Sequence, residues 1–122
     1  MDARAIARFT AAGRVAIGAG FVAYPGLSMR PWLGRDASRA SAMLLARALG
    51  ARDLVLGAGT FGSLSDTPAL RRWLTAALVA DGADLAATLA AGDAIPAAGR
   101  ALVLSIAAVA VGLGAAAVAS LD

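Results

Sequence analysis

The part of the chain that most constrains its fold is a run near its end, residues 101–121, which carries no charged residue. A helix of about 20 apolar residues crosses the hydrocarbon core of a membrane. Three earlier segments, residues 5–24, 39–62 and 68–91, have similar length and are mostly apolar. Stretches rich in proline and glycine separate the four segments, as expected between helices. We therefore predict four transmembrane helices, the fourth over residues 99–121.

The composition supports this interpretation because a soluble domain of this size needs more polar surface. Apolar residues make up 60% of the chain and charged residues 16%, against about 45–50% and about 25% in soluble domains. We predict one all-α domain over residues 1–122, a membrane-embedded up-down bundle of four helices with short loops. The connection over residues 25–38, with two prolines and two glycines, is expected to be a loop.

The residue types that are absent exclude several kinds of chemistry. The chain has no Cys and no His, which excludes disulfides, zinc-thiolate sites, iron–sulfur clusters and imidazole bases. We expect no metal site and no cofactor. The net charge is only +3, and no basic run with interleaved aromatic residues occurs, so we expect no nucleic-acid partner.

Charged residues inside the apolar segments are the most informative feature. Asp53 belongs to a stripe of small residues on the second segment, and such stripes permit close helix packing in lipid. Asp81 and Asp84 share one face of the third segment. The inward faces expected for the first and fourth helices are Arg14, Gly18, Phe21 and Ala101, Ser105, Ala108, Gly112, Ala115.

A charge near the bilayer centre costs on the order of 2.5–3.5 kcal/mol, so these charges are expected to pair. The planar guanidinium of Arg can hold a carboxylate through two hydrogen bonds. We predict a neutral network that ties the first three helices together, three against three: Arg14, Arg47, Arg52 with Asp53, Asp81, Asp84. The alternative to a functional site is that this network only holds the bundle together.

Two short patterns carry a family resemblance: residues 14–18, Arg-Val-Ala-Ile-Gly, and residues 47–53, Arg-Ala-Leu-Gly-Ala-Arg-Asp. With them the chain resembles small bacterial four-helix membrane proteins of unknown function and is distantly similar to the DoxX-type family. The resemblance implies four spanning helices in the bacterial inner (plasma) membrane and no settled activity. Basic residues are balanced between the two sides unless Arg14 is counted, and counting it favours cytoplasmic termini.

Three functions fit these features, and whether the chain is an enzyme stays open. It is an accessory or assembly subunit of a membrane complex, an intramembrane enzyme or binding protein for a lipophilic molecule, or a proton-coupled carrier. In the second, Asp81 or Asp84 supplies acid–base catalysis, and the ligand-binding residues are Arg14, Arg47, Arg52 and Asp53. The expected partners are membrane lipids, a lipophilic small molecule, and further copies or other subunits.

Overall fold

The structure is a computed structural model that describes residues 2–122. These residues form α-helices and two short 3₁₀ turns, and no strand occurs among them. The helices are α1 (Ala3–Ala23), α2 (Pro25–Leu33), α3 (Ala40–Gly62), α4 (Thr67–Ala91) and α5 (Ala97–Ala119), with the 3₁₀ turns at Gly34–Ser38 and Gly92–Ala94. The prediction of an all-helical chain is confirmed.

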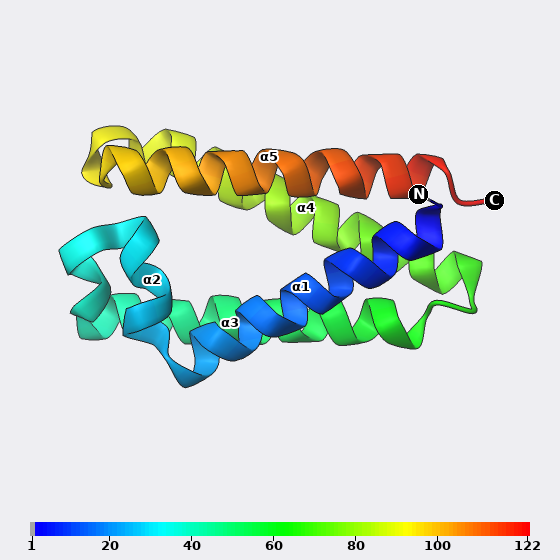
Figure 1. Ribbon diagram of the computed structural model, residues 1–122, viewed down its shortest axis with the longest axis horizontal. Helices are drawn as coiled ribbons and strands as arrows, with labels where there is room; N and C mark the ends of the chain where they lie inside the picture. The colour runs from blue at the N-terminus through cyan, green and yellow to red at the C-terminus, as the bar shows by residue number, and fades with distance from the viewer. Residues whose placement is uncertain (1) are drawn as a thin grey trace.

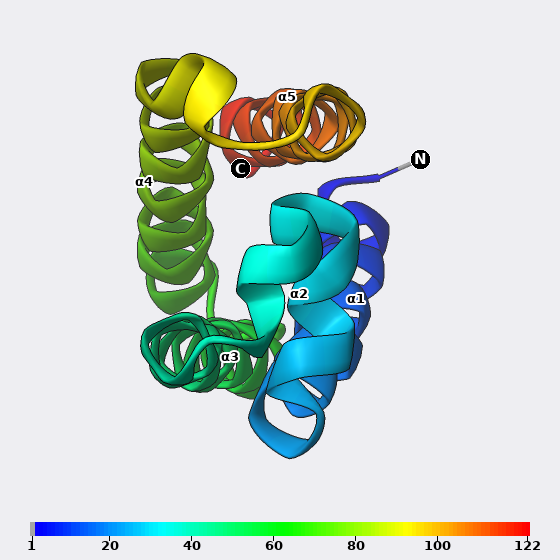
Figure 2. The same cartoon turned by 90° about the vertical axis from the view of Figure 1, so that its left-hand side faces the viewer.

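The four long helices alternate in direction along the molecule. α1 and α3 run side by side in opposite directions, and so do α4 and α5 (Figure 1). Seen along the long axis, α3, α1, α5 and α4 follow one another around a ring (Figure 2). The start of α1 and the end of α5 lie at the end that holds the turn from α3 to α4, whereas α2 lies at the opposite end (Figure 1).

Side-chain caps and proline or glycine residues set the helix ends. The carboxylate of Asp2 accepts a hydrogen bond from the Ala5 amide at 2.7 Å, and that of Asp66 accepts one from the Ala69 amide at 3.0 Å. Each cap satisfies an amide that the first turn of a helix leaves unpaired. Gly92 ends α4 with a φ of 52°, a backbone conformation that favours glycine.

Glycines bring α1 and α3 into close contact. A Cβ atom on Gly18 would lie 2.6 Å from the Gly50 carbonyl oxygen, and one on Gly50 would lie 2.7 Å from the Gly18 oxygen. About two turns after Gly50 along α3, a Cβ on Gly57 would lie 2.9 Å from the Ala11 carbonyl oxygen. No side chain fits at these positions, so the two backbones approach as closely as small residues allow.

The connection after α1 is not the loop that the sequence predicts, because Pro25–Leu33 forms the helix α2. Pro25 occupies the first turn of the helix, where a backbone N–H would have no partner within the helix, so its absence costs no hydrogen bond. Met29 is 3% exposed and packs with Ala46 of α3, and Trp32 lies against the same apolar cluster. This burial stabilises a short helix that proline and glycine content alone would count against.

The inward face predicted for the fourth helix is wrong. In α5 the buried residues are Gly99, Ala107 and Ala117, whereas Ala101 and Gly112 are exposed. Apart from Arg100 and Ser105, α5 is apolar on every side, so its sequence does little to mark which face lies outside. The predicted faces of α3 and α4 carry charges, and there Asp53 and Asp81 are buried as expected.

Three helical stretches are long and apolar enough to cross a membrane by length and composition: α1, α5 and Thr67–Ala94, which begins with α4. α3 differs because Arg47, Arg52 and Asp53 all fall within its 23 residues. Large apolar side chains are exposed on the outer faces of the helices, among them Leu44 and Val79. These features indicate a membrane protein.

Candidate functional site

Arg14 lies at the centre of a polar cluster between three helices. From α1, its Nη1 atom donates to Oδ1 of Asp53 on α3 at 3.1 Å, and its Nη2 atom donates to Oδ2 of Asp81 on α4. The Nη2 atom also donates to the Ala77 carbonyl oxygen at 3.5 Å. One guanidinium therefore joins α1, α3 and α4 through its two terminal nitrogens.

Arg52 forms the second half of the cluster from α3. Its Nη1 and Nη2 atoms donate to Oδ1 and Oδ2 of Asp84 on α4 at 2.9 and 2.7 Å. This is the paired geometry in which the planar guanidinium matches a carboxylate. The Nη2 atom also lies 3.5 Å from Oδ1 of Asp53, which links the two halves of the cluster into one network.

Burial differs between the two halves. The side chains of Arg14, Asp53 and Asp81 are 13%, 11% and 10% exposed. Those of Arg52 and Asp84 are 30% and 24% exposed. The Arg14 half is thus further removed from water, and loss of one partner there leaves an uncompensated buried charge.

The prediction of buried Arg–Asp pairs is confirmed for five of the six residues and wrong for Arg47. Arg47 is exposed and forms no ion pair with any residue in the range 2–122. It lies five positions before Arg52, which is about 140° around a helix at about 3.6 residues per turn. The sequence does not reveal which of the two arginines faces α1 and α4. The predicted balance of three against three is therefore two arginines against three aspartates.

The cluster forms the polar end of a cavity of about 310 Å³. Apart from the charged residues, the lining is mostly apolar and comes from α1, α3, α4 and α5, with Trp32 added from α2. The apolar lining residues are Phe9, Gly13, Ile17, Phe21, Trp32, Leu49, Leu74, Ala77, Leu78, Val103, Ile106, Ala107, Val109, Ala110, Leu113 and Gly114. The cavity is thus lined by apolar side chains and by the charged side chains of the cluster.

The rim of this cavity lies between α1 and α5. Phe9 and Ile17 of α1 line it and are 67% and 48% exposed, and Ile106 and Val109 of α5 line it and are 53% and 61% exposed. Because these side chains reach both the cavity and the surface, the cavity opens on the outer, apolar side of the molecule. The sequence does not mark these lining residues, because apolar residues occur on all sides of α1 and α5.

An apolar cluster closes the molecule at the end where the chain begins and finishes. Leu74 belongs both to this cluster and to the cavity wall. The other buried members include Ile6 of α1, Leu70 of α4 and Leu121 after α5. Arg71 donates to the Val118 carbonyl oxygen at 2.9 Å and holds the end of α5 to α4. The cavity is therefore closed toward this end of the molecule.

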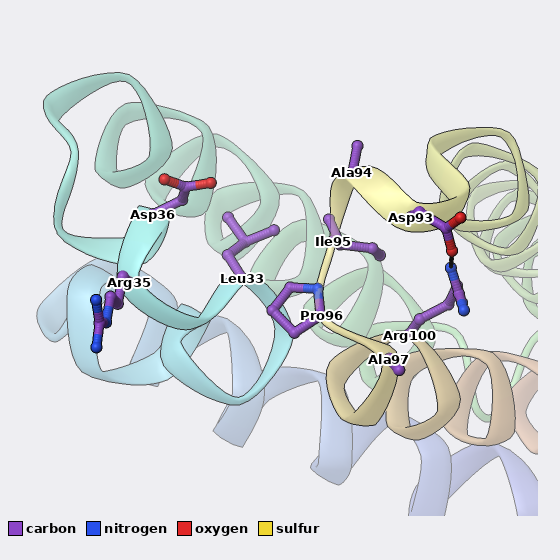
Figure 3. Close-up of a pocket in the computed structure, with 9 residues that line it drawn as sticks. All are labelled: Leu33, Arg35, Asp36, Asp93, Ala94, Ile95, Pro96, Ala97 and Arg100. Atoms are coloured by element: carbon purple, nitrogen blue, oxygen red, sulfur yellow. Dashed lines mark hydrogen bonds and ion pairs between the residues drawn. The ribbon is translucent and has the colours of Figure 1, made fainter.

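A second hollow, of about 490 Å³, lies at the opposite end between the turn after α2 and the turn before α5. Its floor is apolar, with Leu33, Ile95 and Pro96 (Figure 3). Its charged groups do not converge: Arg100 pairs with Asp93 at 2.9 Å, and the Arg35 side chain points away from this pair. Among the described residues, no group of three or more carboxylates could hold a metal ion.

The chain matches no protein-family model, no curated protein and no solved structure. The resemblance to the DoxX-type family therefore stays a prediction, as do the roles assigned to the cluster residues. Asp81 and Asp84, the proposed acid–base residues, are both bonded to arginine.

Proposed function

We propose that α3 crosses the membrane together with the three more apolar helices, so that the protein is a four-helix membrane bundle. Its 23 residues correspond to about 35 Å of helix, and the hydrocarbon core is about 30 Å thick. Arg52 and Asp53 have partners on neighbouring helices, which offsets most of the cost of burying them. The bacterial inner membrane and cytoplasmic termini remain our predictions for its location.

We propose that the protein binds a lipophilic small molecule in the cavity between α1 and α5. The observation that carries this proposal is the cavity itself, with apolar walls, a charged end and a rim on the lipid-facing surface. Its volume of about 310 Å³ lies at the lower end of the range of about 300–1,000 Å³ for ligand pockets. An apolar tail fits the walls, and a polar headgroup satisfies the charged end.

Access from the bilayer follows from the position of the rim. A molecule dissolved in lipid reaches the gap between Ile17 and Ile106 without passing through water, because both side chains are on the outer surface. A bundle that served purely as a support would gain by filling this space, because an empty cavity loses packing contacts.

A variant that fills the cavity tests this proposal. No atom lies within 4 Å of a Cβ atom built on Gly13, which lines the cavity, or on Gly112, which does not. We expect protein purified in mild detergent to carry a lipophilic compound in near-stoichiometric amount, measured by mass spectrometry of an organic extract. Gly13→Leu should lose this compound and Gly112→Leu should retain it.

Two outcomes would contradict the proposal. Equal amounts of the compound in both variants would place it on the general lipid surface and contradict the proposal. Absence of any bound compound from the wild type, with no uptake of added lipophilic molecules, would contradict it as well. Both substitutions put a leucine on a glycine with open space around it, so a difference between them is not an effect of helix propensity.

A second candidate function, a subunit of a larger membrane complex, has support from Arg47. This residue is exposed, lies about 10 Å from the start of α3, and has no ion-pair partner within residues 2–122. On the same helix, Leu44 and Val55 are 68% and 58% exposed. A carboxylate from another membrane chain, or from a second copy, would offset a cost of roughly 2.5–3.5 kcal/mol for this charge in lipid.

The size of the particle in mild detergent tests this second candidate. We expect wild-type protein from native membranes to migrate as a larger species on a native gel and Arg47→Gln to release the single chain. Arg35→Gln, which removes an exposed arginine outside the helical bundle, is the control and should leave the larger species intact. A wild-type protein that migrates as a single chain would rule this candidate out.

A further inference from the structure

The charged end of the cavity has more acids than bases. Arg14 and Arg52 face three carboxylates there, and no other charged residue lines the cavity. With all of them ionised, the cluster has a formal charge of −1. A net charge in a site of low dielectric constant is unfavourable unless a counter-charge lies next to it. Arg47, the predicted third base, is on the outer surface of α3 and does not supply that counter-charge.

The hydrogen bonds show which kind of group the site lacks. Asp53 uses Oδ1 and Asp81 uses Oδ2 in their bonds to arginine, and their second oxygens have no bond to any residue in the range 2–122. Both residues line the cavity, and counted over the whole residue they are 8% and 7% exposed. The terminal nitrogens of Arg14 and Arg52 are already bonded to carboxylates. One donor of the cluster, the Nε atom of Arg52, also has no partner, but it is buried. The accessible groups that the cluster leaves for a ligand are therefore the acceptor oxygens of Asp53 and Asp81.

We infer that the ligand is a lipophilic cation, a protonated amine on an apolar tail. Its ammonium group brings one positive charge and up to three N–H donors. It would donate to the second oxygens of Asp53 and Asp81, which one guanidinium already holds close together. The tail would lie along the apolar walls toward the α1–α5 rim. This inference rests on the proposed function, because it names the class of molecule that the cavity takes.

Other ways to balance the cluster predict different ligands. A proton on one of the carboxylates makes the cluster neutral, and then a neutral alcohol binds as well as an amine. A fatty acid adds a second negative charge and must displace an aspartate from Arg14 or Arg52. The headgroup preference of the cavity therefore distinguishes these cases.

The experiment compares three probes with the same tail: decylamine, decanol and decanoate. Their binding to wild-type protein in detergent is measured by native mass spectrometry at neutral pH. We expect decylamine to bind at least about tenfold more tightly than decanol, since a charge-assisted bond is about twice as strong as a neutral one. Decanoate should bind most weakly. Decanol or decanoate equal to or tighter than decylamine would overturn the inference and leave the proposed function standing.

A matched pair of variants adds a second readout. Asp53→Asn makes the cluster neutral and keeps an oxygen that accepts from Arg14, so decylamine binding should weaken about tenfold and decanol binding should change less than about twofold. Asp36→Asn, an exposed carboxylate paired with Arg39, should change neither. If Asp53→Asn fails to fold, the relative affinities of the three probes for the wild-type protein still test the inference. Failure of all three probes to bind would overturn both the inference and the proposed function.

Discussion

Arg14 is the residue whose ion pairs connect the largest number of helices. It is the one side chain through which α1 forms ion pairs with both α3 and α4 in the described chain. Its partners Asp53 and Asp81 are buried, so neither can replace the guanidinium with water. A change at Arg14 therefore affects the folded state and the cavity together.

We predict that Arg14→Gln destabilises the protein by about 3–5 kcal/mol, because it leaves Asp81 without a counter-charge and Asp53 with only Arg52 at 3.5 Å. Arg47→Gln removes the same charge from an exposed position and should change stability by no more than about 0.5 kcal/mol. Unfolding in mixed micelles with rising SDS, followed by tryptophan fluorescence, measures both. Equal stability of the two variants would show that the Arg14 pairs contribute little.

The sequence predicts the residues of the Arg–Asp cluster well, except for Arg47. The cost of charge in lipid requires the acids and bases to meet, and the small-residue stripe orients Asp53 inward. Arg47 and Arg52 lie on either side of that stripe, and only the position of α4 relative to α3 decides which of them is paired. That position depends on tertiary packing, which the pattern of one helix does not contain.

Among the helices, the α1–α3 contact is the closest, and it sets the position of Arg14 against Asp53. The backbones meet at Gly18 and Gly50, four residues from Arg14 and three from Asp53. Because these glycines leave no room for a side chain, the distance between the two helices is fixed near the cluster. The polar geometry thus depends on small residues that carry no charge.

Opposite effects are expected from alanine at two helical glycines. Gly50→Ala should destabilise the protein by about 1–3 kcal/mol, because the new Cβ lies too close to the Gly18 oxygen. Gly112→Ala, with open space around its Cβ, should stabilise it by about 0.5–1 kcal/mol through better helix propensity. The same SDS unfolding measures both. A stabilising Gly50→Ala would show that the helices are not packed as tightly as described.

The helices themselves are largely predictable from the sequence, and their faces only in part. Proline, glycine and capping residues mark the ends of the long helices. α3 ends at Gly62, and α4 ends at Ala91, directly before Gly92. α2 is not predictable in this way, because it is stabilised by the burial of Met29 against α3. The inward face of α5 is likewise unmarked, because small residues occur on all its sides and packing against α4 and α1 selects among them.

In the molecule as a whole, we propose that a lipophilic ligand enters between α1 and α5 and places its polar end at the Arg–Asp cluster. The molecule contains two pairs of antiparallel helices, α1 with α3 and α4 with α5 (Figure 2). Residues of all four helices line the cavity. The cluster joins the two pairs on the side of α4, whose Asp81 bonds Arg14 of α1 and whose Asp84 bonds Arg52 of α3. The rim lies on the other side, where α1 faces α5.

The location of a bound probe tests this claim most directly. Wild-type protein is labelled in light with a decylamine that carries a diazirine at the end of its tail, and the labelled peptides are identified by mass spectrometry. We predict labelling at the rim residues Ile17 and Val109 that excess decylamine abolishes, while any labelling at Leu44 on the outer face of α3 persists. Labelling spread evenly over the lipid-facing surface, with no part that decylamine removes, would contradict the account.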